Sequence, residues 1–145
     1  MNLLDTFRHE HQQLRERLTR LEEALAQDET TFPAVFFAFQ ADASAHMKRK
    51  DLFYKQLDEN HRVPDRVLMH DLRNNHAAVV FALESLGIRL RKNGPNAEWR
   101  LRWTSMTNVL KPHWDQEERD LFPLFESLLS AEEQQRLTRD IEALR

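Results

Sequence analysis

Apolar residues recur along this chain at alternating steps of three and four, the spacing of one face of an α-helix. Polar or Pro/Gly-containing breaks interrupt the pattern at 27–31, 59–66 and 92–98. The pattern therefore predicts four amphipathic helices. They span 3–26, 32–58, 65–91 and 97–129. Because the connections are short, neighbouring helices should run antiparallel, in an up-down-up-down four-helix bundle.

A shorter fifth helix is expected at the C-terminus. Ser130 and Glu133 have the spacing of a capping box, which marks a helix start. After it, Leu137, Ile141 and Leu144 form an apolar stripe. A chain of 145 residues suits one domain with a single core, so we predict one all-α domain over residues 1–145.

The fourth predicted helix shows what is unusual about these stripes. Its stripe consists of Trp99, Trp103, Met106, Leu110, His113, Glu117, Asp120, Leu124 and Leu128. Each of the other three helices likewise carries one histidine in an otherwise mostly apolar stripe: His11, His46 and His76. A buried imidazole without a partner costs about 1–3 kcal/mol. Four such costs would consume a large share of a stability of about 5–15 kcal/mol.

A shared metal ion would compensate for this burial, because neutral imidazole is a common ligand of iron, zinc and copper. Glu117 follows His113 by four residues, so both side chains lie on one helix face and can reach one ion. The competing interpretation is four separately hydrogen-bonded core histidines, with Glu117 as a surface charge. The remaining histidines, His9, His61 and His70, lie off the stripes or in a loop, and we expect them at the surface.

Composition removes several other classes of protein. Apolar residues make up 41% and charged residues 31%, and the net charge is −3, so no basic face suggests a nucleic-acid partner. There is no cysteine, which excludes disulfides and thiolate metal sites. The N-terminus becomes charged after four residues and the apolar runs are too short for a bilayer. We therefore expect a cytoplasmic protein that does not enter the membrane.

Four segments of the chain resemble the hemerythrin-like, HHE cation-binding family. They are RHEHQQL at 8–14, AHMKRKDLFYKQL at 45–57, NHAAVVFALESL at 75–86 and PHWDQEERDLFPLF at 112–125. The resemblance implies a non-haem di-iron centre inside a four-helix bundle, held by histidines and bridging carboxylates. The implied ligands are His11, His46, His76, His113 and Glu117. It also implies reversible O2 binding, sensing of iron or oxygen, or handling of NO or peroxide.

The chain departs from the family pattern at Lys50. Family members usually carry His-x-x-x-Glu on the second helix, but Lys50 is the residue four after His46. The third helix also has Leu72 where a second histidine would stand. In one interpretation Asp51 replaces the missing glutamate as a ligand. In a second, Lys50 takes one iron position and pairs with Glu117, leaving one ion or none. In a third, Lys50 points outward to solvent.

Three functions follow from these interpretations. The first is a ligand-poor iron site, with two irons or one, that binds or senses O2, NO, peroxide or iron. The second is a degenerate bundle acting as a regulatory or interaction module with little or no metal, for which Trp99 and Trp114 would mark a partner surface. The third, a di-iron oxidase or peroxidase, is the least favoured, because no Glu-x-x-His pair lies on the stripes. We therefore favour a protein that is not an enzyme.

Overall fold

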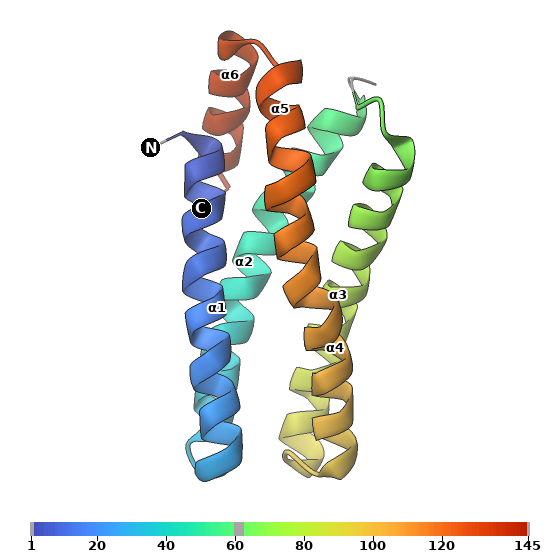
Figure 1. The fold of residues 1–145 in the computed structure, drawn as a ribbon. Coiled ribbons are helices and arrows are strands. Elements are labelled where there is room, and N and C mark those ends of the chain that lie inside the picture. The colour runs from blue at the N-terminus through green and yellow to red at the C-terminus, as the bar shows by residue number, and fades with distance from the viewer. Residues whose placement is uncertain (1, 60–62, 145) are drawn as a thin grey trace.

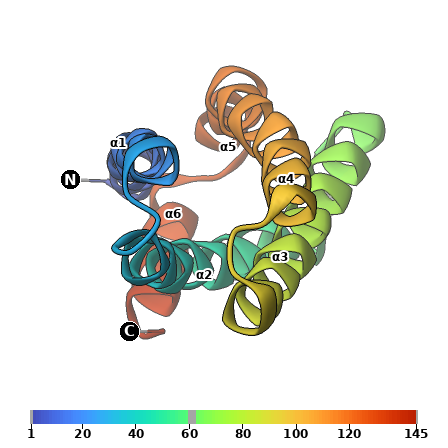
Figure 2. The same cartoon turned by 90° about the horizontal axis from the view of Figure 1, so that it is seen from below.

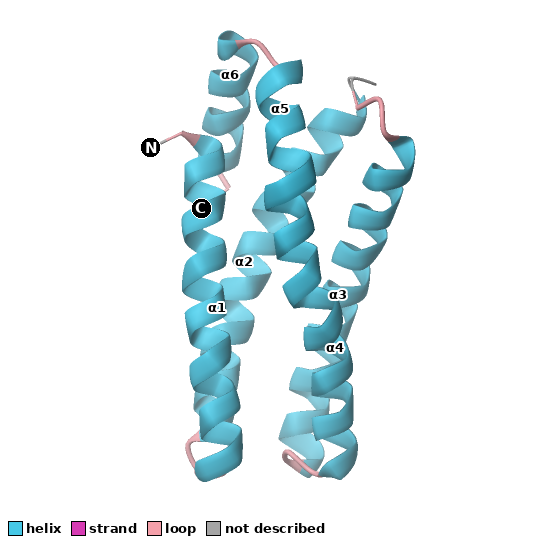
Figure 3. Ribbon diagram, viewed as in Figure 1, coloured by secondary structure: helices cyan, strands magenta, loops and turns pink. Residues whose placement is uncertain are grey.

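The computed structural model describes residues 2–59 and 63–144, which form an antiparallel helical bundle (Figure 1). Throughout these residues the structure consists of helices joined by loops (Figure 3). In chain order the elements are α1 (Leu3–Gln27), α2 (Phe32–Glu59), α3 (Arg66–Asn93), α4 (Ala97–Gln116), the π-helical turn η1 (Glu117–Leu121), α5 (Phe122–Leu128) and α6 (Ala131–Glu142). η1 and α5 continue α4 upward in Figure 1, and α5 lies beside α6. The predicted all-α bundle is confirmed.

Side-chain caps set the starts of the helices close to their predicted positions. Asn2, Asp65 and Asn96 each accept a hydrogen bond from the backbone N–H three residues ahead. The predicted capping box at Ser130 forms, with both of its hydrogen bonds present. The fifth predicted stripe is wrong at its end, however. Leu144 is 52% exposed because α6 stops at Glu142.

The fourth predicted helix is interrupted by the π-helical turn, which corrects its predicted stripe. The Phe122 N–H donates to the Glu117 carbonyl, a step of five residues instead of four. Because of the extra residue, each later buried position lies one residue further along the chain than predicted. Leu121, Phe125 and Leu129 are therefore buried. The sequence pattern had assigned those places to Asp120, Leu124 and Leu128, none of which is fully buried.

The apolar core is divided into two clusters along the bundle axis. One cluster contains the halves of the helices that lie lower in Figure 1, with Leu14–Leu25 of α1 and Trp99–Leu110 of α4. The other contains the upper halves and the buried residues of α6. The long helices surround one interior (Figure 2). Between the clusters each of them contributes at least one buried polar side chain to it. We call this group the histidine layer. Its members are His11, His46, Lys50, His76, His113 and Glu117.

Two further sequence-based expectations concern surfaces. Trp99 and Trp114 were expected to mark a partner surface, but they are 1% and 0% exposed, so this expectation is wrong. The Trp99 indole N–H donates to the Leu86 carbonyl at 2.9 Å, which satisfies its polar group inside the core. Among the described residues, no helix combines the length and the apolar character that crossing a bilayer requires.

Candidate metal centre

The structure brings all four stripe histidines and Glu117 to one level of the bundle. Each of these side chains is at most 4% exposed. The imidazoles form two pairs from neighbouring helices. The rings of His11 on α1 and His46 on α2 have centroids 4.8 Å apart, and those of His76 on α3 and His113 on α4 are 6.2 Å apart.

Glu117 lies between the two pairs of imidazoles. Its Oε1 is 3.2 Å from His113 Nε2 and 3.6 Å from His11 Nε2. Two ligands of one tetrahedral ion, each about 2.0–2.1 Å from it, lie about 3.3 Å apart. The spacing is therefore compatible with one ion beside Oε1. Even so, the described part of the chain holds no group of three or more histidine and carboxylate side chains already arranged to bind an ion.

Two carboxylates outside the predicted ligand set orient the first pair of imidazoles. His46 Nδ1 is 2.6 Å from Glu10 Oε2, and His11 Nδ1 is 2.9 Å from Glu118 Oε1. Glu10 is held in turn by Arg49. If Nδ1 carries the proton in each contact, Nε2 is the nitrogen left free to bind a metal.

Sequence reasoning missed Glu10 and Glu118 because they do not belong to any stripe. Each is adjacent in sequence to a predicted ligand, about 100° round the helix from it, and so has the position of a surface residue. Only the packing of α1 against α2 and η1 turns these carboxylates toward an imidazole of another helix. The one available signal was an acidic residue next to a predicted ligand, His11 for Glu10 and Glu117 for Glu118.

Asp51 lies at the edge of the centre. Its side chain is 65% exposed, and its Oδ1 is 2.7 Å from His76 Nε2. The contact is short, but it does not have the geometry of a ring hydrogen bond, so we treat it as a contact of the carboxylate with the edge of a neutral ring. Asp51 thus approaches His76 from outside, where an orienting carboxylate would stand, and the structure does not bring it to Glu117.

Several buried ring nitrogens of the histidine layer lack a hydrogen-bond partner among the described residues. They are His11 Nε2, both nitrogens of His76, and His113 Nδ1. Buried polar atoms are nearly always hydrogen-bonded, and each exception costs about 1–3 kcal/mol. A bound cation can be ligated by one nitrogen of each neutral ring, and His11 Nε2 is an unpartnered nitrogen on the side of Glu117 Oε1, which is an independent reason to place a ligand there.

Lys50 is fully inside the centre, which excludes the outward-pointing interpretation. It is 1% exposed, and its Nζ contacts Glu117 Oε2. The Tyr54 hydroxyl donates to the same oxygen at 2.5 Å. Sequence reasoning missed Tyr54, although it follows Lys50 by one helical turn on the same face of α2.

Burial keeps the histidines of the centre neutral. It lowers the pKa of His11 to about 3, of His46 to about 4 and of His113 to about 2. Burial also lowers the pKa of His76 and, strongly, that of Lys50, and the contact of Lys50 Nζ with the Glu117 carboxylate opposes the effect on Lys50. Neutral imidazole is the form that binds metal ions, so the rings are in a binding-competent state near pH 7.

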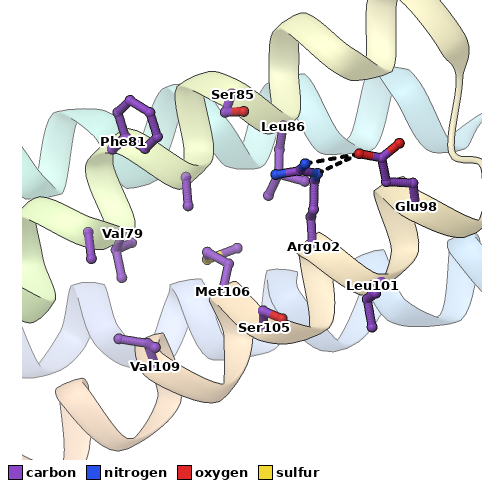
Figure 4. Close-up of a pocket in the computed structure, with 12 residues that line it drawn as sticks. Val79, Phe81, Ser85, Leu86, Glu98, Leu101, Arg102, Ser105, Met106 and Val109 are labelled. Atoms are coloured by element: carbon purple, nitrogen blue, oxygen red, sulfur yellow. Dashed lines mark hydrogen bonds and ion pairs between the residues drawn. The ribbon is translucent and has the colours of Figure 1, made fainter.

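The remaining histidines do not belong to the centre. His9 and His70 are exposed, which confirms the expectation from the sequence. His61 lies outside the described residues. A groove of about 600 Å³ opens between α3 and α4, where Phe81 and Leu101 are exposed (Figure 4). None of the predicted ligands lines this groove.

A smaller cleft connects the centre with the surface. It has a volume of about 420 Å³ and opens between α2 and α3. Asp51, Tyr54 and His76 are among the residues that line it. The centre is therefore one side chain away from a surface cleft on this side of the bundle.

Comparison with known proteins gives one result. The Hemerythrin HHE cation binding domain family matches residues 2–125, a stretch that includes all the predicted ligands. No curated protein and no solved structure matches the chain.

Proposed function

We propose, from the premise that the chain belongs to the hemerythrin HHE cation-binding family, that it binds non-haem iron in the histidine layer. The proposed ligands come from His11, His46, His76, His113 and Glu117. One observation carries the proposal: four buried imidazoles from four helices lie at one level of the bundle, two of them within 3.6 Å of the Glu117 carboxylate, and several of their nitrogens have no hydrogen-bond partner among the described residues.

The residues fit one ion better than two. Oε1 of Glu117 faces two imidazole nitrogens, whereas its Oε2 is occupied by Lys50 and Tyr54. A lysine ammonium has donors only, so it cannot supply the bridging carboxylate that the family pattern places here. Asp51, the alternative carboxylate, is at the outer side of His76. We therefore propose a ligand-poor centre.

Such a centre suits a small ligand. An iron ion with an open coordination position can bind O2, NO or peroxide. The rings of Phe7, Phe53 and Phe122 pack close to Lys50 and exclude water from that side. The cleft lined by Tyr54 and His76 gives a short approach from solvent. We propose that the protein binds or senses one of these molecules, or iron itself, in the cytoplasm, and that catalysis is not its main task.

The contact of Lys50 with Glu117 favours a second candidate function. The pair already neutralises the one buried carboxylate of the histidine layer without a metal. In this second proposal the bundle is a metal-poor regulatory or interaction module. A partner surface would then lie elsewhere than at Trp99 and Trp114, because both are buried.

Metal analysis separates the two functions. The protein would be purified without a histidine tag, loaded anaerobically with Fe(II), freed of excess ion, and analysed for iron per chain. The first proposal expects bound iron that changes its visible spectrum when O2 or NO is added. Absence of iron after loading would contradict it and support the metal-poor module.

Matched variants locate the bound iron. His113→Ala removes a buried imidazole 3.2 Å from Glu117 and should abolish or strongly weaken iron binding. His70→Ala removes an exposed imidazole and should leave binding unchanged. Iron binding retained equally in both variants would mean that the iron is bound non-specifically, outside the histidine layer.

A further inference from the structure

The two oxygens of Glu117 face two different environments. Oε1 faces imidazole nitrogens, at 3.2 Å from His113 Nε2 and 3.6 Å from His11 Nε2. Oε2 faces the Lys50 ammonium and accepts the Tyr54 hydroxyl. A carboxylate that bridges two cations turns one oxygen toward each of them. The place of the second cation, on the Oε2 side, therefore holds a side chain of the protein.

The surroundings of Lys50 Nζ are those of a cation site. Aromatic ring centroids stand 5.1 to 5.5 Å from the nitrogen, within the range of cation–π attraction. The rings belong to Phe7, Phe53, Tyr54 and Phe122. A buried ammonium persists only when its charge is compensated, and here Glu117 supplies the opposite charge.

Lys50 also occupies the helix position from which a ligand would enter the centre. It follows His46 by one turn of α2, so the two side chains lie on the same buried face of that helix. Both are 1% exposed. The neighbouring lysine, Lys48, is exposed on the same helix and has no such position. The burial of Lys50 is therefore a property of its place in the stripe.

We infer that the Lys50 ammonium replaces one of the two cations of the centre, so that at most one metal ion fits beside Glu117. The inference rests on the proposed function, because it assigns the number of ions held at that same centre. Glu117 then pairs with one protein cation through Oε2 and with one metal ion through Oε1. In the metal-free protein, Lys50 alone balances the buried carboxylate.

Charge-changing variants of Lys50 test this inference. Lys50→Glu restores the carboxylate of the family pattern, Lys50→Gln removes only the charge, and Lys48→Glu is the matched control at the surface. Each protein would be loaded anaerobically with Fe(II), analysed for ions per chain, and examined by Mössbauer spectroscopy. We expect at most one ion in the native chain and in the control, and two magnetically coupled ions in Lys50→Glu.

The neutral variant gives a second, independent readout. Removing a like charge beside the ion should strengthen Fe(II) binding by about tenfold or more in Lys50→Gln. Because this variant adds no second carboxylate, it should still hold one ion. If Lys50→Glu fails to fold, this affinity decides the question, and an unchanged affinity would overturn the inference.

The remaining outcomes separate the inference from the proposed function. Two ions in the native chain would overturn the inference and leave the proposed function standing. No ion in the native chain but bound iron in Lys50→Glu would support the inference and contradict iron binding by the native protein. One ion in both the native chain and a folded Lys50→Glu would overturn the inference, and no ion in any variant would overturn both.

Discussion

Each imidazole of the histidine layer depends on residues that its own helix stripe does not reveal. Burial keeps the ring neutral, and a carboxylate on another helix orients His11 and His46. The sequence predicts the burial, because the histidines occupy stripe positions. It does not predict the orienting carboxylates, and it gives the contact of Lys50 with Glu117 only as one of three interpretations, because both depend on how far each helix is rotated toward its neighbours.

Removing one orienting carboxylate should weaken metal binding. Glu10→Gln leaves an acceptor for His46 Nδ1 but removes the charge and the strong bond to Arg49. We expect the Fe(II) dissociation constant to rise by about 10–100-fold, the usual effect of losing such a partner. Anaerobic calorimetric titration measures it. Glu16→Gln, at an exposed position of α1, is the control, and equal affinity in both variants would contradict the role given to Glu10.

At the scale of elements, the bounds of the long helices could be predicted and the π-helical turn could not. The histidines of α1, α2 and α3 were correctly predicted to lie in buried stripes because the steps of three and four around them have no interruption. In η1 the adjacent apolar residues Leu121 and Phe122 fit either register. The tertiary structure selects the register that is shifted by one residue, since this register buries Leu121, Phe122 and Phe125 together in the upper cluster.

Single-residue deletions test this register. Deleting exposed Arg119 should convert η1 into a regular α-helical turn while Leu121 and Phe125 keep their buried faces, so the bundle should still fold and unfold cooperatively. Deleting the exposed Asn108 in α4 should instead rotate His113 and Glu117 by about 100° out of the histidine layer. Circular dichroism during thermal unfolding compares the two. Similar loss of structure in both deletions would contradict the assigned register.

At the scale of the whole molecule, the histidine layer separates two apolar clusters that hold the bundle together above and below it. This arrangement explains how the fold tolerates a group of buried polar side chains at its middle. It also makes the stability of the metal-free protein sensitive to acid, because these imidazoles cannot take up protons while they are buried.

The sign of this pH effect follows from the lowered pKa values of His11, His46 and His113, at about 3, 4 and 2. The unfolded chain binds these protons below about pH 6.5 and the folded chain does not, so stability is lost as the pH falls below that value. The expected slope approaches about 1.4 kcal/mol per pH unit for each such histidine.

The effect can be measured by urea unfolding of the metal-free protein at pH 7.5, 6.5 and 5.5, a range set by the ordinary histidine pKa of about 6.5. The midpoint should fall modestly between the two higher values and about three times as far between the two lower ones. His70→Gln should retain the same dependence because His70 is exposed. A midpoint that is flat throughout this range would contradict neutral burial of the three imidazoles.

A crystal structure of the protein loaded anaerobically with Fe(II), with anomalous data collected on both sides of the iron absorption edge, tests the central claim most directly. The account predicts one anomalous peak inside the bundle, between Glu117 Oε1 and the imidazoles of His11 and His113, with Lys50 on the opposite side of the carboxylate. No peak in the histidine layer, or peaks only at surface side chains, would contradict it.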